Sequence, residues 1–345
     1  MATRGVVKRK PAVAEPLADG ATDSAANDSP KRLRGGKADD EVRALPMDNV
    51  VDVAEFHTTL EAALHPIRQG LTDREAQISS LHNVAKDLMC HWDLWIGEHC
   101  HRILELEAYV HSHCHTDPYT HGDEGQRSCG VWYFHRQGTT FKSGSFKGLD
   151  LACGDSATGT SAGLLIRSVT EEQDSGTPEL TEGPCLVVDR ILRLCGQPSI
   201  QAFVAGRTAA ELPAATTEGL CLRRSAVPRT DRVWTAPRVG LVLRAEQEAK
   251  THSAGRPIDF IVRPYRFSTA PWLLRKFRAG FVATDHVHDP DNAAGRLHLL
   301  KLPNGREYRD SVEAGRAAGN PERFVDKKIA TQNELCELVG ASTTV

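Results

Sequence analysis

The sequence predicts an α+β protein, a single domain in which helices flank a curved, mostly antiparallel β-sheet. Apolar residues recur at helical spacing between residues 50 and 89. Beyond Trp92, short apolar runs are separated by glycine and polar turns, as in strands joined by hairpins. The chain has 345 residues, of which 40% are hydrophobic and 25% charged, which is enough for one large core with polar tails.

The first 46 residues should form a disordered tail, because they are rich in Ala, Asp, Ser, Gly and Pro and carry no periodicity. Two basic clusters lie in this tail, Lys8-Arg9-Lys10 and Lys31-Arg32-Leu33-Arg34, at the spacing of a bipartite nuclear address. Acidic residues are absent before Glu15, which leaves an organellar presequence as the alternative. The tail therefore predicts a nuclear protein.

The folded domain is expected at residues 50–285, followed by a C-terminal extension at 286–345. It should open with two or three helices, in which Phe56, Leu60 and Leu64 share one face. Strands are expected at residues 103–110, 131–134, 164–169, 185–188, 239–243 and 259–262, and helices near 186–194 and 199–204. In the extension, Pro303-Asn304-Gly305 predicts a hairpin at 300–308, and a helix is expected near 330–339.

Composition narrows the class of protein. No run approaches the roughly 20 apolar residues that span a bilayer, so we expect no membrane partner. The nine cysteines are scattered without a close pair, which fits reduced thiols in the cytosol or nucleus. The net charge is −3, yet thirteen basic and four acidic residues lie between Cys221 and Gly280. That stretch predicts either solvated strand faces or a surface that binds phosphates.

A histidine-rich segment raises the question of a metal. His111, His113 and His115 alternate, so on a strand they would share one face, with His121 close behind. This arrangement permits a zinc-dependent hydrolase as one alternative. The spacing matches no specific zinc signature, so we favour an exposed histidine-rich loop and expect neither a metal nor an organic cofactor.

Acidic and apolar residues alternate just before that segment. On a strand, Glu105, Glu107 and Tyr109 would face one way, while Leu104, Leu106 and Ala108 face the core. Taken alone, the pattern fits an edge strand with solvated carboxylates. A carboxylate beside an aromatic ring also suits a base-binding pocket, because the ring stacks on a flipped base and the carboxylate deprotonates water.

The run Leu106-Glu107-Ala108-Tyr109 resembles the glutamate-alanine-tyrosine motif of the alkyladenine (3-methyladenine) DNA glycosylases. The resemblance implies that Glu107 is the catalytic base and that Tyr109 stacks on the flipped base. It also implies that His121 contacts this base, since Asp117 and His121 stand at the family's spacing. The strand at 163–169 resembles the family strand that ends in an arginine, so Arg167 should help to hold the attacking water.

Two later segments, 236–240 and 256–262, resemble the family's closing turn and final strand, so the similarity runs in order over about half of the chain. The family's aromatic hairpin, which wedges a tyrosine into duplex DNA, is altered here. Either Phe146 or Lys147 falls at the wedge position. Lys142, Arg238 and Arg263 are the expected contacts with the DNA backbone.

The resemblance implies the alkyladenine glycosylase fold and an enzyme that hydrolyses the N-glycosidic bond of alkylated or deaminated purines. Its partner should be double-stranded DNA with damaged bases, and we expect a monomer. Because no lysine is expected at the pocket as an amine nucleophile, strand cleavage is not predicted. The altered hairpin motivates the main alternative, a protein of the same fold that binds DNA or damage but has lost efficient catalysis.

Overall fold

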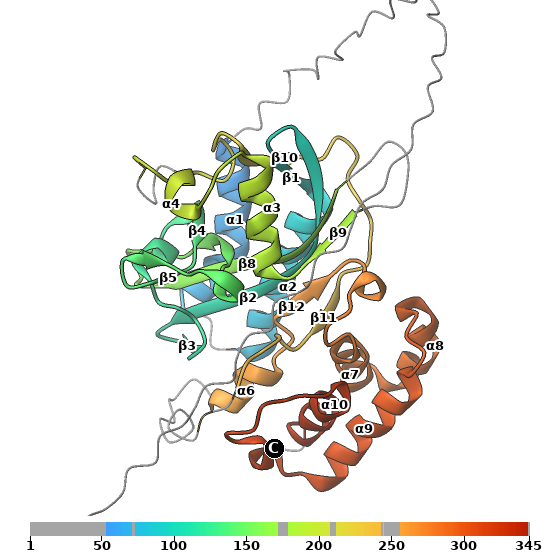
Figure 1. Cartoon of the computed structure of the whole chain (residues 1–345). Coiled ribbons are helices and arrows are strands. Elements are labelled where there is room, and N and C mark those ends of the chain that lie inside the picture. The colour runs from blue at the N-terminus through green and yellow to red at the C-terminus, as the bar shows by residue number, and fades with distance from the viewer. Residues whose placement is uncertain are drawn as a thin grey trace, which may run out of the picture. The chain divides into compact units, whose positions relative to one another are not determined.

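A computed structural model describes residues 53–70, 73–171, 179–207, 212–242, 244 and 256–343 (Figure 1). The predicted disordered tail, with its two basic clusters, lies outside these residues. The described part has the predicted mixed α+β architecture, in which helices flank a mostly antiparallel sheet. None of its helices is long and apolar enough to cross a bilayer.

Two helices precede the sheet, as the helical periodicity predicts: α1 (Val53–Arg68) and α2 (Arg74–His91). Asp73 caps α2, because its side chain accepts a hydrogen bond of 2.7 Å from Ala76 N, a donor without a partner inside the helix. The apolar faces of both helices, with residues such as Leu64 and Leu88, are buried in the main core.

The main sheet is antiparallel at every pairing among the described residues. The strands are β1 (Trp92–Ile96), β2 (His99–Ser112), β3 (His115–Thr116), β4 (Cys129–Phe134), β7 (Leu149–Cys153), β8 (Ser161–Glu171), β9 (Glu179–Glu182), β10 (Leu220–Arg224), β11 (Trp234–Ala236) and β12 (Arg266–Ser268). Its central order is β10-β1-β2-β8-β7-β4, and β12 also pairs with β2. The strands β5 (Arg136–Gln137) and β6 (Thr140–Phe141) form a separate hairpin. The long strand β2 thus connects most of the sheet.

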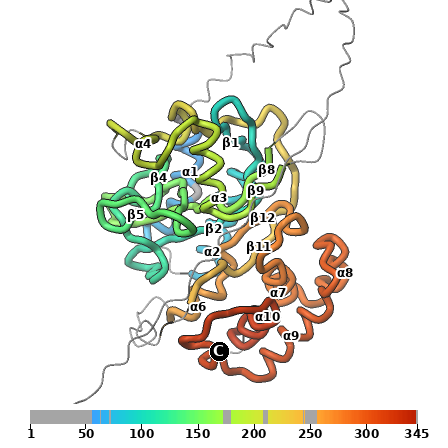
Figure 2. Tube along the Cα trace, viewed as in Figure 1, coloured from blue at the N-terminus to red at the C-terminus, as the bar shows by residue number. Residues whose placement is uncertain are grey.

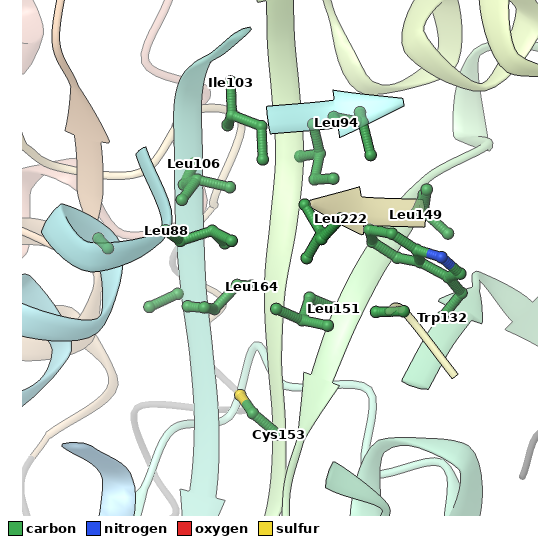
Figure 3. Packing of buried hydrophobic residues seen from close by; sticks show 14 of the residues in the cluster. Leu88, Leu94, Ile103, Leu106, Trp132, Leu149, Leu151, Cys153, Leu164 and Leu222 are labelled. Carbon is green, nitrogen blue, oxygen red and sulfur yellow. The ribbon is translucent and has the colours of Figure 1, made fainter. Parts of the chain in front are cut away.

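The alternation predicted for β2 holds at Leu106 and Ala108 but not at Leu104, because a register shift at Glu105 puts Ile103 in the main core instead. Leu106 lies in the main apolar core with Leu164 of β8 and Leu151 of β7 (Figure 3), and Ala108 belongs to the same core. Burying one such leucine contributes roughly 1.5–3 kcal/mol. Successive side chains of a strand point to opposite faces, so this packing directs Glu107, which lies between Leu106 and Ala108, to the other face.

Three predicted strands are wrong. Residues 185–188 belong to helix α3 (Pro184–Leu194), and residues 259–262 belong to helix α6 (Pro257–Val262). Both helices start with proline, whose fixed φ suits the first helical position. In α6 the Asp259 side chain also bonds back to Arg256 N at 3.0 Å. Residues 239 and 240 form a bend with φ of +82° at Gly240, which glycine adopts without strain, and residues 241 and 242 belong to no strand; residue 243 lies outside the described residues.

The remaining short elements are one helix and several 3₁₀ turns. Helix α4 (Ile200–Phe203) confirms the helix expected near residues 199–204. Single 3₁₀ turns occur at η1 (Glu124–Arg127), η2 (Gly144–Phe146), η4 (Pro271–Leu273) and η5 (Pro321–Phe324).

The C-terminal part is helical: α7 (Ala279–His288), α8 (Pro290–Leu300), α9 (Gly305–Ala318) and α10 (Gln332–Ala341) (Figure 2). The helix expected near 330–339 is confirmed. The hairpin at 300–308 is wrong, because α8 ends there and α9 begins. These helices share a second apolar core with Trp234 of β11. The expected domain limit at residue 285 falls inside α7.

Candidate active site

Register places the polar face of β2 opposite two neighbouring strands. Glu107 pairs with Leu165 of β8 and with Arg266 of β12, and Tyr109 pairs with Gly163 of β8. Asp150 of β7 in turn pairs with Leu165. Residues that pair directly in an antiparallel sheet share a face, so Glu107, Leu165 and Asp150 form one row.

Glu107 is completely buried and accepts three hydrogen bonds. The Tyr109 hydroxyl donates to Oε2 at 2.8 Å, and Arg167 Nη1 donates to the same oxygen at 3.2 Å. The backbone N–H of Val239 donates to Oε1 at 2.6 Å. The structure therefore brings three of the predicted site residues, Glu107, Tyr109 and Arg167, into direct contact.

The ionisation of this cluster follows from its charges. Burial, together with the charge of Glu107, raises the pKa of Tyr109 well above its usual value, so its hydroxyl keeps the proton that it donates. Burial alone would lower the pKa of Arg167, but the charges of Glu107 and Glu105 outweigh it and raise that pKa. Arg167 is therefore a permanent cation beside the candidate base.

A second glutamate, Glu105, holds Arg167 from the other side and was not predicted as a site residue. Its Oε1 accepts bonds from Arg167 Nε at 3.0 Å and from Arg266 Nε at 2.6 Å. Burial alone would raise the pKa of Glu105, but Arg266 and Arg167 outweigh it and hold that pKa at about 2. The alternation of acids on β2 was the available signal for Glu105, whereas Arg266 comes from a distant strand.

Arg238 anchors the turn that supplies Val239. Its guanidinium is buried and makes a bidentate ion pair with Asp117, at 2.6 and 3.1 Å. It also donates to the carbonyl of Ala108 at 3.1 Å and lies 4.4 Å from the centre of the Tyr109 ring. One arginine thus fixes both the ring of Tyr109 and the peptide that binds Glu107.

The expectation that Arg238 and Arg263 contact the DNA backbone is not compatible with this burial. Arg238 is 2% exposed, and Arg263 is 4% exposed with its guanidinium 4.0 Å from the centre of the Phe260 ring. A phosphate on the surface cannot reach either group. The basic stretch between residues 221 and 280 is therefore partly internal, since Arg266 is also buried against Glu105.

His121 lies in a different polar cluster. Its Nε2 is 3.4 Å from Lys142 Nζ, and its ring packs edge-on against His135 at 4.6 Å between centres. His135 Nε2 bonds Asp150 Oδ1 at 2.7 Å. Burial, followed by the charges of His135 and Lys142, lowers the pKa of His121 to about 4. This second cluster was missed in sequence, because nothing local links Asp150 to the histidines.

The altered hairpin region distinguishes the two wedge candidates. Phe146 is 75% exposed at the end of η2, whereas the Lys147 ammonium is bound by Asp189 of α3. His121, Lys142 and Phe146 line one open cavity of 750 Å³. Phe146 is therefore the side chain that is free to meet another molecule.

The alternating histidines do not converge. β2 ends at Ser112, and the chain turns before His115. Both ring nitrogens of His115 are engaged, by Val110 O and by the Tyr265 hydroxyl, each at 2.8 Å. Among the described residues no group of three or more acidic, histidine or cysteine side chains could hold a metal ion.

Comparison with known proteins links part of the chain to a viral protein. No family model and no solved structure matches the chain. An uncharacterized protein of Acanthamoeba polyphaga mimivirus is 32% identical over 152 residues, which are 41% of this chain and 68% of the viral protein. The chain therefore belongs to the same protein family as this uncharacterized mimivirus protein.

Proposed function

We propose that the protein is a DNA glycosylase-like hydrolase, which removes alkylated or deaminated purines from duplex DNA by activating water at Glu107. The observation that carries this proposal is the environment of Glu107. A buried carboxylate on the polar face of a sheet is held by a phenol, a guanidinium and a backbone N–H. Three donors thus fix the position of the one carboxylate that we assign as the general base.

The described hydrogen bonds leave part of the acceptor capacity of Glu107 unused. A carboxylate has about four acceptor directions, and among the described residues Glu107 Oε1 accepts one hydrogen bond, from Val239 N. A water bound at the remaining direction would be oriented by Glu107 and polarised for attack on the anomeric carbon. General-base assistance of this kind is typically worth about 10²- to 10⁴-fold in rate.

Tyr109 supplies the stacking surface in this proposal. Its hydroxyl is tied to Glu107 and Arg238 lies over its ring, so its side chain needs no reorganisation when a base arrives. A flipped purine stacked on this ring would bring its glycosidic bond near Glu107. Flipping costs a few kcal/mol, and least for damaged pairs, which contributes to selectivity before chemistry begins.

The exposed Phe146 and the cationic Lys142 are the side chains that we assign to DNA contact. An exposed ring can fill the gap that a flipped nucleotide leaves, and a cation beside it attracts phosphate. We propose that the protein acts as a monomer, and the basic clusters of its N-terminal tail support a nuclear location.

A second candidate is a DNA-binding protein with little or no catalysis. The burial of the Glu107–Arg167 ion pair favours it, because paired buried charges also occur as purely structural elements. This candidate predicts binding to damaged duplex without release of a base.

Duplexes that carry 1,N⁶-ethenoadenine, hypoxanthine or 3-methyladenine, followed by alkaline cleavage of abasic sites, separate the two candidates. We expect excision of at least one lesion, reduced about 10²- to 10⁴-fold in Glu107→Gln with DNA affinity retained. Glu98→Gln, at an exposed turn, is the matched control. Binding without any product from the wild type would exclude the enzyme, and activity within a few-fold in Glu107→Gln would exclude this base.

A further inference from the structure

The open cavity of 750 Å³ beside the β5–β6 hairpin has a lining of one charge sign. Among the described residues its charged side chains are Arg136 and Lys142, and no carboxylate lines it. The remainder of the lining consists of His121, Gln137, Thr140, Phe141, Ser143 and Phe146. Cations, hydroxyls and aromatic rings in one cavity suit a ligand that joins an anion to a flat ring, and the size falls within the range of about 300–1,000 Å³ that ligand pockets occupy.

Arg136 is a cation with unused hydrogen-bonding capacity. It pairs with Phe141 across the hairpin, and its guanidinium carbon lies 4.6 Å from the centre of that ring. This contact covers one face of the guanidinium and leaves the N–H groups at its edge available. Among the described residues no carboxylate forms an ion pair with Arg136, and its buried Nε has no hydrogen-bond partner. The edge of this guanidinium is therefore preorganised to bind a phosphate.

Lys142 supplies the second cation. Its backbone N–H donates to His135 O at 2.9 Å, which extends the hairpin, and its half-buried side chain reaches His121 Nε2 at 3.4 Å. Burial, followed by the charges of His135 and Lys142, lowers the pKa of His121 to about 4, so this imidazole is neutral at neutral pH. Among the described residues no carboxylate forms an ion pair with Lys142 either. Two cations without acidic partners thus line one cavity, which is the charge pattern of a phosphate site.

Phe146 supplies the ring on which a base can stack. The ring is 75% exposed at the end of η2, and the next residue, Lys147, is bound by Asp189 of α3, which fixes the end of this turn. Bases in an intact duplex are stacked on both faces, whereas bases in a single strand offer an open face to an aromatic side chain. A cavity that joins such a ring to two cations therefore favours an unpaired nucleotide over a closed duplex.

We propose that this cavity is a binding site for an unpaired nucleotide of a DNA strand, with the base stacked on Phe146 and the flanking phosphates bound by Arg136 and Lys142. The inference deepens the proposed function and rests on it in one respect, that DNA is the partner. It assigns Arg136 to DNA binding, and it predicts affinity for single-stranded DNA that carries no lesion. On a duplex the same ring inserts beside the flipped nucleotide, and the same cations bind the phosphates next to the gap.

The test measures binding of the full-length protein to a fluorescently labelled oligodeoxythymidine by fluorescence anisotropy at several salt concentrations. We expect binding that weakens with salt, since each phosphate neutralised on a single strand contributes about −0.7 to the slope of log K against the log of salt concentration. Arg136→Gln and Lys142→Gln should each lower the affinity and make this slope shallower by about 0.7. Phe146→Ala should lower the affinity by roughly 5- to 150-fold at an unchanged slope, because it removes stacking but no charge.

Two exposed side chains that do not line this cavity provide matched controls. Lys86→Gln on α2 removes a charge and Leu299→Ala on α8 removes an apolar side chain, and both variants should bind like the wild type. Lys142→Gln leaves the contact between Arg136 and Phe141 in place, so it tests the charge even where loss of that contact weakens the hairpin.

No binding of the single strand by the wild type would overturn the proposal, as would an unchanged affinity in Phe146→Ala or an unchanged affinity and slope in Arg136→Gln and Lys142→Gln. Because the oligonucleotide carries no lesion, this result does not depend on base removal. Single-strand binding without excision of any lesion would sink the proposed glycosylase activity alone, whereas excision without single-strand binding would sink only this nucleotide site.

Discussion

Glu105 offers a direct test of how the buried ion cluster is built. The carboxylate is 1% exposed and is shared by Arg167 and Arg266, which are themselves buried. Glu105→Gln keeps the shape but removes the charge, so it leaves Arg266 without a carboxylate among the described contacts. Breaking a buried pair in this way costs about 3–5 kcal/mol, because the remaining charge stays desolvated.

The pKa of Glu105 gives an independent value for the free energy that its charge contributes to stability. Its pKa of about 2 in the folded protein lies below its usual value of 4.5. The ionised form therefore contributes about 3 kcal/mol, which is fully present above pH 4.5 and is lost as the pH falls towards 2. The midpoint of thermal unfolding falls by about 2–4 °C for each kcal/mol of stability lost. A loss of about 3–5 kcal/mol in Glu105→Gln therefore corresponds to a midpoint roughly 6–20 °C lower.

Thermal and urea unfolding of Glu105→Gln at pH 7 measure this loss. Glu179→Gln is the matched control, because Glu179 also pairs with an arginine, Arg190, but its side chain is 56% exposed. The control should change the unfolding free energy by less than about 1 kcal/mol. A Glu105→Gln variant within 1 kcal/mol of the wild type at pH 7, or a difference that grows as the pH falls from 4.5, would refute the reasoning.

Two further predictions concern other elements of the site. His115 has a pKa of about 4 in the folded protein, against 6.5 ordinarily, because it is buried. The unfolded chain therefore binds the proton more readily, and the unfolding free energy of the wild type should fall by about 3 kcal/mol more than that of His115→Gln between pH 6.5 and 4. Urea unfolding at both pH values measures this, and an equal fall in the unfolding free energy of the two proteins would contradict the prediction. Phe146→Ala should leave stability within about 0.5 kcal/mol, because the ring is 75% exposed. It should weaken lesion-duplex binding, measured by fluorescence anisotropy, by roughly 5- to 150-fold, as loss of one stacking contact implies. Unchanged affinity would exclude Phe146 as the side chain that inserts into the duplex.

The parts of the site that lie within one strand could be predicted from sequence. The alternation around Glu107 identifies both the face of β2 and its core side, because the period of a strand is local information. The partners that complete the cluster are not local: Arg266 is 161 residues from Glu105, and Val239 is 132 residues from Glu107. Pairing at such separations depends on the topology of the sheet, which a single sequence does not reveal.

Errors in the predicted fold arose where a short apolar run is compatible with either a strand or a helix. Residues 258–262 are apolar enough for a buried strand, yet Pro257 and Asp259 make them a capped helix. The basic stretch was misread in a similar way, because a count of charges does not show that Arg238 and Arg266 point inward. Short runs and charge counts need tertiary contacts before they can be interpreted.

The register of β2 has a consequence for how this site can vary. Inserting or deleting one residue between Glu105 and Tyr109 would put the residues before and after the change out of phase, so Glu105 and Tyr109 would no longer face the same side of the sheet. The turn after β2 carries no such constraint, since its length does not alter which way Glu107 points. We therefore expect relatives with this chemistry to differ freely in their loops while keeping the spacing within this strand.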